Sequence, residues 1–344
     1  MAPKVHVINW NVTGACNLRC RHCFAAAGQK APTELTTEEG LSLLEEIRKT
    51  FGRIKVTLGN AEPLMRDDIL DFVDYGSELG LSMALATNGT LLTEKEVMQF
   101  KRAGLKEIAL PIDGVRKTND RIRGRGSFDA VLRVAKAARK AKLTIVVSSC
   151  ILRMNIAELT QILDICTKLG AQRSEIFHYI TMGRGLKELP NEALDEKQFV
   201  QSLFSIYEEQ KRRRGLEIYP TTACQYWVVL NQKFEQGDFV PEYFFKMVPG
   251  CGAGISMFSV KPDGNVTACP MLNTYVGNVR EAPLKKLWHS KAFEKLRLRD
   301  VKGQCGLCKY KNICMGCRVR AFIRYDNFLA EDPLCGFFEP TESR

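Results

Sequence analysis

The sequence has no hydrophobic run of the roughly 18–20 residues that a membrane-spanning helix needs. Its first ten residues lack the apolar stretch and the small-residue cleavage site of a signal peptide. Histidine is scarce, with four residues in 344. Because 45% of the residues are hydrophobic and 26% are charged, wholesale disorder is also excluded. We therefore expect a folded, cytoplasmic protein without a membrane partner.

The charge balance is positive, with a formal net charge of +11. Such an excess favours anionic partners, including nucleic acid, acidic lipid and polycarboxylate small molecules. The densest basic run, residues 211–214, stands at the end of a helical stretch, where cations complement the helix dipole. We therefore interpret this run as a solvated helix end and predict no nucleic-acid partner.

Apolar strand-like segments alternate with amphipathic helical segments through the first half of the chain. This alternation predicts a parallel sheet whose right-handed crossovers curl it into a partial, TIM-like (β/α)6 barrel of the α/β class. In such barrels the chemistry takes place at the carboxyl ends of the strands. The predicted strands are 5–9, 54–58, 82–86, 107–112, 144–150 and 174–180, and the predicted helices are 36–51, 67–79, 94–103, 128–141 and 157–169.

The second half of the chain has a different character. A helix over residues 194–214 is followed by an aromatic-rich segment, and from Cys251 onward cysteine, glycine and short turns dominate. We expect a barrel over 1–190, a bridging helical and aromatic segment over 191–250, and a small cysteine-rich domain over 251–344. The last part has little periodic apolar sequence, so bound metal is expected to stabilise it.

Thirteen cysteines in a chain without a secretory signal indicate metal ligands rather than disulfides. The first group, Cys16, Cys20 and Cys23, follows the first predicted strand. Three thiolates at this spacing can hold one 4Fe–4S cluster and leave its fourth iron open to a small molecule. A structural zinc site needs four ligands, and His22 is too close in sequence to supply the fourth.

This Cys-x3-Cys-x2-Cys motif, in the first loop of a strand–helix barrel, resembles that of the radical S-adenosylmethionine (radical SAM) superfamily. The resemblance implies that the open iron binds the amine and carboxylate of SAM. Electron transfer then cleaves the sulfonium, and the resulting 5′-deoxyadenosyl radical abstracts a hydrogen atom from the substrate.

Further elements of that family stand at the predicted strand ends. The family's Gly-Gly-Glu-Pro loop, which holds the amino group of SAM, is matched by Gly59-Asn60-Ala61-Glu62-Pro63, in which Asn60 and Ala61 replace two glycines. The other candidate SAM contacts are Thr87 and Asn88 after the third strand, Asp113 after the fourth, Arg121 and Arg123 as partners for a carboxylate, and Ser148 and Asn155 near the ribose. Turn formation and surface solvation are the alternative explanations for these residues. We expect His178 to be a core residue.

The C-terminal cysteines are similar to those of the SPASM extension, which holds one or two auxiliary 4Fe–4S clusters. The extension usually has three residues between the two cysteines that correspond to Cys314 and Cys317, whereas this chain has two. The resemblance implies that Cys305, Cys308, Cys314 and Cys335 bind a distal auxiliary cluster, and that Cys251, Cys269 and Cys317 bind a proximal one.

Only three ligands are thus evident for the proximal cluster. Cys224 is either its fourth ligand, or a catalytic thiol that donates a hydrogen atom to a substrate radical, or a small buried residue of the core. If Cys224 is not a ligand, the proximal cluster keeps an open iron for substrate. We assign Cys150 and Cys166 to the core.

The tail from Cys314 to Cys335 and the stretch 182–185 resemble the branch of the family that acts on haem precursors. That branch includes the haem d1, didecarboxysirohaem and iron-coproporphyrin enzymes. The resemblance implies an oxidoreductase or lyase that acts on an anionic tetrapyrrole with electrons from a donor such as flavodoxin or ferredoxin. Modification of a ribosomal peptide, and dehydrogenation of a sugar or alcohol, stay open. The first cluster motif begins at residue 16, so we expect no leader-peptide-binding domain before it.

Overall fold

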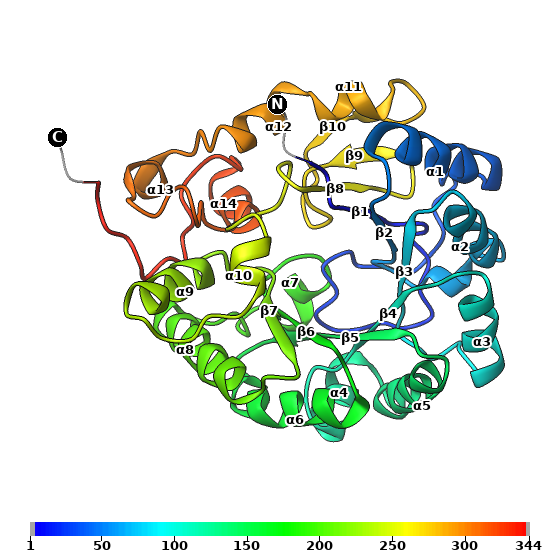
Figure 1. Ribbon diagram of the computed structural model, residues 1–344, viewed down its shortest axis with the longest axis horizontal. Helices are drawn as coiled ribbons and strands as arrows, with labels where there is room; N and C mark the ends of the chain where they lie inside the picture. Colours follow the sequence, from blue (N-terminus) through cyan, green and yellow to red (C-terminus); the bar gives the residue numbers. More distant parts are fainter. Residues whose placement is uncertain (1–3, 342–344) are drawn as a thin grey trace.

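The computed structural model describes residues 4–341, which form one curved sheet with helices along its outer side (Figure 1). The sheet has ten strands in the order β10-β9-β8-β1-β2-β3-β4-β5-β6-β7. Strands β1 to β7 pair in parallel in chain order and form the barrel. They are β1 (Val7–Trp10), β2 (Lys55–Leu58), β3 (Ser82–Ala86), β4 (Glu107–Pro111), β5 (Thr144–Ile151), β6 (Arg173–His178) and β7 (Glu217–Pro220).

Helices connect the parallel strands across the outer side of the sheet. Their starts follow from the sequence, because the side chains of Thr36 and Thr93 cap the amides three residues ahead and Glu39 and Glu96 complete capping boxes. The helices are α1 (Thr37–Phe51), η1 (Pro63–Met65), α2 (Ile69–Glu78), α3 (Glu94–Arg102), α4 (Arg116–Arg123), α5 (Ser127–Lys140), η2 (Ile156–Glu158), α6 (Leu159–Leu169), α7 (Gly185–Glu188) and α8 (Glu196–Arg212). Within residues 4–341, none of the helices is long and apolar enough to cross a membrane.

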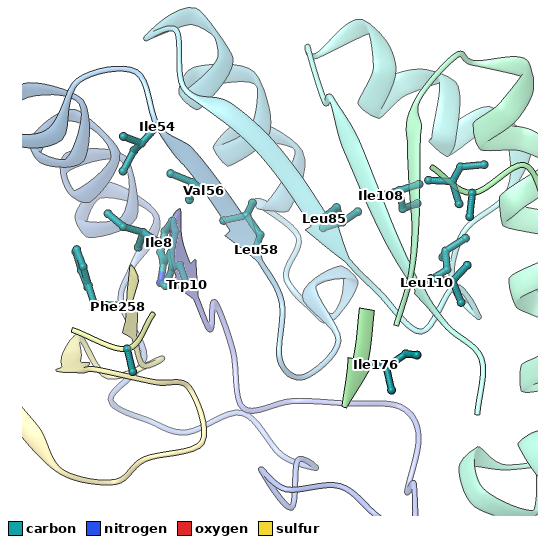
Figure 2. Close-up of a cluster of buried hydrophobic side chains, with 14 of the residues drawn as sticks. Ile8, Trp10, Ile54, Val56, Leu58, Leu85, Ile108, Leu110, Ile176 and Phe258 are labelled. Atoms are coloured by element: carbon teal, nitrogen blue, oxygen red, sulfur yellow. The ribbon is translucent and has the colours of Figure 1, made fainter. Parts of the chain in front are cut away.

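The main core lies between the sheet and these helices. Alternate strand residues point outward into it, as Figure 2 shows for Ile8, Val56 and Ile108. Trp10, which is fully buried, packs its ring 4.9 Å from that of Phe72 on α2. The residues between these positions face the inside of the barrel.

The cysteine-rich part continues the same sheet. Strand β8 (Met257–Val260) pairs in parallel with β1, and β9 (Asn265–Thr267) and β10 (Tyr275–Asn278) follow in antiparallel order. Phe258 of β8 packs between Phe51 of α1 and Trp288. The remaining helices are α9 (Tyr226–Glu235), α10 (Tyr243–Lys246), α11 (Leu284–Trp288), α12 (Lys291–Arg297), α13 (Gly303–Leu307) and α14 (Arg318–Tyr325).

The expected parallel barrel is confirmed, and the structure extends it at both edges. A seventh parallel strand, β7, lies within the segment that the sequence pattern assigned to a bridge. At the other edge β8–β10 join the barrel sheet, so residues 257–278 are held by the ladder and by an aromatic core as well as by any metal. The division of the chain at 190 and 250 stays a prediction.

The inner face of the barrel differs between its two ends. At the amino ends of the strands Arg173 lies within 4 Å of Glu107, Glu175 and Glu217, and Lys55 also pairs with Glu107. At the carboxyl ends the inner positions of β2 to β5 carry small or polar side chains, namely Thr57, Ala86, Pro111 and Ser148. On β6 and β7 the same face carries the aromatic side chains of Phe177 and Tyr219.

Candidate active site

Cys16, Cys20 and Cys23 lie on a loop that leaves the carboxyl end of β1. Backbone hydrogen bonds close the base of this loop, because the amide of Cys16 donates to the carbonyl of Gly28 at 3.0 Å. All three thiols are partly exposed. Burial raises the pKa of Cys20, and the neighbouring thiols of Cys23 and Cys16 add to this rise. Three soft sulfur donors on one short loop fit a 4Fe–4S cluster with one iron free of protein ligands.

Glu34 closes the same loop from within. One of its carboxylate oxygens accepts hydrogen bonds from the hydroxyl of Thr13 at 3.1 Å and from the amides of Gly14 and Ala31 at 2.8 and 2.9 Å. The residue is only 7% exposed. Glu34 therefore joins the start and the end of the cysteine loop, a role that its sequence position alone did not indicate.

The loop after β6 holds the cysteine loop from the opposite side of the barrel. Arg184 donates from its guanidinium to the carbonyls of Cys20 at 2.8 Å and Ala27 at 2.5 Å, and from its amide to Cys23 at 3.0 Å. Gly183 has a φ of +55°, and a Cβ there would lie 2.3 Å from the carbonyl oxygen of Phe24. The Gly183-Arg184 pair is therefore a support for the cysteine loop, which sequence analysis missed because it had no local signal for this contact.

Glu62 is the central polar residue at the end of β2, and it is completely buried. Its two oxygens accept from the hydroxyl of Thr87 at 2.8 Å, the amide of Asn88 at 2.7 Å and the amide of Leu64 at 3.2 Å. Burial raises the pKa of Glu62, and these hydrogen bonds oppose the rise. The carboxylate is held rigidly, as binding of an ammonium group would require.

The neighbouring loop residues bring Glu62 close to the cysteines. Gly59 is required by the approach of β2 to β3, since a Cβ there would lie 2.7 Å from that of Ala86. Asn60 has a positive φ of 73° and hydrogen-bonds to Asn11, so asparagine fills a position where the family carries glycine. Ala61 and Pro63 complete the loop. Asn88 donates to the side chain of Asn17, next to Cys16, at 2.8 Å.

Asp113 is the centre of a second buried group, at the end of β4. Its carboxylate lies 2.9 Å from the Nε2 of His22 and 2.6 Å from the Nε of Arg123, and it accepts from the amide of Cys150 at 2.7 Å. Burial alone would raise the pKa of Asp113, but the charges of Arg123 and His22 lower it overall. His22 is thereby turned toward β4, a pairing that sequence analysis did not anticipate.

The remaining candidate SAM contacts are placed differently. Arg121 is exposed on α4. Ser148 stands on the inner face of β5 beside Pro111. Asn155 is buried and bonded to backbone, because its Nδ2 donates to the carbonyls of Asp113 and Cys150 at 2.7 and 2.8 Å and its Oδ1 accepts from Leu152. Asn155 braces the loop after β5.

The four C-terminal cysteines assigned to a distal cluster line one pocket: Cys305, Cys308, Cys314 and Cys335. Burial raises the pKa of Cys335 to about 11, and Cys305 and Cys308 contribute as neighbouring charges. These four soft donors around one cavity fit a fully ligated 4Fe–4S cluster.

Cys251, Cys269 and Cys317 form a second group beside it. Burial raises the pKa of Cys269 to about 12, with Cys251 and Cys317 as charged neighbours. Cys224, which is 5% exposed, lies next to Cys251, and hydrogen bonding between the two thiols lowers the pKa of Cys251. The structure thus brings a fourth thiol to the three that sequence similarity indicated.

His178 and Cys166 stand apart from these groups. His178 points outward from β6, with its Nε2 2.8 Å from the hydroxyl of Ser202, and burial and then the charge of Arg320 lower its pKa to about 3. Cys166 is fully buried in α6, as expected of a core residue. Cys150, also expected in the core, instead lies half-buried on the inner face of β5, beside Asp113 and Arg123.

Comparison with known families agrees with this arrangement. Residues 10–166 match the model of the radical SAM superfamily, and residues 251–318 match the SPASM iron–sulfur cluster-binding domain.

Individual relatives match nearly the whole chain. An AdoMet-dependent heme synthase of Methanosarcina barkeri is 32% identical over 343 residues, which cover 97% of this chain and 96% of the relative. An Fe-coproporphyrin III synthase of the same organism is 31% identical, covering 96% of this chain and 88% of the relative. Streptococcus suis SuiB bound to precursor peptide SuiA has the same fold, with a TM-score of 0.76 at 16% identity over 97% of this chain and 76% of that one.

Proposed function

Because the chain belongs to the radical SAM superfamily and carries a SPASM domain, we propose that this radical enzyme modifies a haem-precursor tetrapyrrole. Its cofactors are SAM and 4Fe–4S clusters. When bound, these supply a 5′-deoxyadenosyl radical that removes a hydrogen atom from the substrate. The finer assignment is to an oxidoreductase or lyase that receives electrons from a donor of the flavodoxin or ferredoxin type.

The residues at the strand ends have distinct parts in holding SAM. Cys16, Cys20 and Cys23 hold the 4Fe–4S cluster to which SAM binds. Glu62, fixed by Thr87 and Asn88, accepts the ammonium group of its methionyl part. The guanidinium of Arg123, held over the barrel mouth by Asp113, provides a cation for the carboxylate.

The observation that carries the tetrapyrrole assignment is the match over nearly full length to a heme synthase. Two features of this chain support it. The inner face combines small side chains on β3 to β5 with the aromatic rings of Phe177 and Tyr219 on β6 and β7, surfaces against which a flat molecule can stack. The net charge of +11 suits a substrate with several carboxylates.

The test is anaerobic incubation of the reconstituted enzyme with SAM, a reductant and iron-coproporphyrin. We expect loss of the porphyrin, a product of lower mass and formation of 5′-deoxyadenosine, with omission of SAM as the control. If iron-coproporphyrin and other haem precursors are unchanged while a peptide encoded by a neighbouring gene is modified, the tetrapyrrole assignment is wrong.

For Cys224 we propose the role of fourth ligand to the proximal cluster, on the strength of its position against Cys251. Replacement of Cys224 by alanine should then change the electron paramagnetic resonance signal of that cluster, because ligands set cluster electronics. Cys166→Ala, which removes a buried thiol of α6 that hydrogen-bonds to Ser174, is the matched control and should leave all signals intact.

Two other results would contradict this role. Unchanged iron content and spectra with loss of product would identify Cys224 as a hydrogen-atom donor. Unchanged spectra with unchanged turnover would leave only a packing role, with a stability loss of roughly 1 kcal/mol for a small buried side chain.

A further inference from the structure

A buried ion pair stands between the two groups of C-terminal cysteines. Arg320 of α14 and Asp332 of the following loop are 8% and 4% exposed. The guanidinium donates in a bidentate manner, from Nε to one carboxylate oxygen at 2.9 Å and from Nη2 to the other at 2.7 Å. The pair is therefore fixed in orientation.

Surrounding groups satisfy both charges. The carboxylate of Asp332 also accepts from the amides of Cys317 and Leu334 at 2.7 and 3.1 Å and from the side chain of Gln225 at 2.8 Å. Arg320 donates to the carbonyl of Thr222 at 2.8 Å. Apolar residues of similar volume often stabilise a protein as well as a buried ion pair does. Stability alone does not explain two charges at this place.

The pair has a direction relative to the cysteines. Asp332 donates its amide to the sulfur of Cys305 at 3.3 Å, and its carboxylate is a charged neighbour of three distal cysteines, Cys305, Cys314 and Cys335. The carboxylate also neighbours Cys317 of the proximal group, but there the opposite charge of Arg320 has the larger influence. The guanidinium of Arg320 has Cys317 and Cys224 as neighbours, and so faces the proximal group.

Other charges near the clusters lie on both sides of the pair. The guanidinium of Arg318 is 3.9 Å from the sulfur of Cys305 and also acts on Cys251. Arg299 neighbours Cys251 and Cys314, and Lys261 neighbours Cys269. These groups remain when the pair is altered, so the contribution of Arg320 and Asp332 can be measured against a constant background.

We propose that the Arg320–Asp332 pair sets the order of the reduction potentials of the two auxiliary clusters, with the proximal one easier to reduce. A negative charge beside a cluster disfavours its reduced, more negative form, and a positive charge favours it. An electron released by the substrate radical therefore resides on the proximal cluster, next to the active site. This inference rests on the proposed two-cluster assignment.

The test is a potentiometric titration, followed by electron paramagnetic resonance, of protein in which Cys16, Cys20 and Cys23 are alanine. Only the auxiliary clusters then contribute, and Cys269→Ala identifies the proximal signal. Asp332→Asn, which keeps the shape of the side chain, should raise the distal potential by more than the proximal one. A tenfold change in the reduction equilibrium corresponds to 59 mV for one electron.

Arg320 gives the complementary measurement. Arg320→Met should lower the reduction potential of the proximal cluster. Arg320→Lys keeps the positive charge, so its proximal potential should stay close to that of the unaltered protein. Glu209→Gln, which weakens the contact of Glu209 with Arg213 on α8, is the control and should move neither potential. If Asp332→Asn does not retain its iron, the comparison of the two Arg320 variants decides the question.

Equal potentials in Arg320→Met and Arg320→Lys would overturn the inference, as would equal shifts of both clusters in Asp332→Asn. The background that lacks Cys16, Cys20 and Cys23 should hold about eight irons per chain on 4Fe–4S counting. About four would refute the two-cluster assignment and the inference with it. The titration contains no substrate, so an error in the tetrapyrrole assignment leaves its result unchanged.

Discussion

Replacement of Cys16, Cys20 and Cys23 by alanine should abolish the formation of 5′-deoxyadenosine from SAM. The three thiols stand on one loop beside Glu62 and Asn88, and the other cysteine groups are assigned four ligands each, which leaves them no iron for SAM. Chromatographic assay of the nucleoside after anaerobic reduction is the measurement. The expected result is a loss to the level of enzyme-free controls.

The auxiliary cysteines provide the matched comparison. The double variant Cys305→Ala, Cys308→Ala should form no product but still cleave SAM. These two residues line the pocket of the distal group, and the first cysteine loop stays intact. If the triple variant of the first loop still cleaves SAM, the assignment of that loop is wrong.

Glu62→Gln should produce the second largest effect, a loss of SAM affinity of roughly tenfold to a hundredfold. Hydrogen bonds to charged groups contribute about 1.5–3 kcal/mol, and each 1.4 kcal/mol is about tenfold in affinity. The side-chain NH2 of the glutamine would also face a group that already donates, either the Thr87 hydroxyl or the Asn88 amide. One buried hydrogen bond is therefore lost. Titration of the first cluster's resonance signal with SAM measures the change.

Glu107→Gln is the control for this variant. Glu107 also lies on the barrel, but at the amino end of β4, where it pairs with Lys55 and Arg173. Its replacement should leave SAM affinity unchanged. Equal affinity in Glu62→Gln and in the unaltered enzyme would remove Glu62 from the ammonium site.

The sequence predicted the features that depend on short, contiguous patterns. The barrel followed from strand–helix alternation, and the helices expected from residues 36 and 94 begin within one residue of those positions, after the N-caps Thr36 and Thr93. The resemblance to the SPASM extension predicted the distal group of thiols, whose four members line one pocket. These signals are local because a helix cap or a ligand loop is built from neighbouring residues.

Contacts between distant segments were not predictable in the same way. Arg184 and Cys20 are 164 residues apart, and the chain alone contains no sign that they meet. The short strand β7 was hidden in an aromatic-rich segment, and β8 in a stretch rich in turns. Asn155, a candidate ribose contact by position, is instead saturated with backbone hydrogen bonds.

The parallel pairing of β1 with β8 has a consequence for the order of folding. Val7 pairs with Met257 and Trp10 with Val260, so the strand that carries the first cysteine loop gains its second neighbour only when residues near 260 have been synthesised. Until then β1 is a sheet edge with unpaired backbone groups, which is open to association with other chains. Contacts of such long sequence separation also form late, because the intervening loop must close first. The edge of the strand that carries the cysteine loop is therefore protected only after most of the chain has been made.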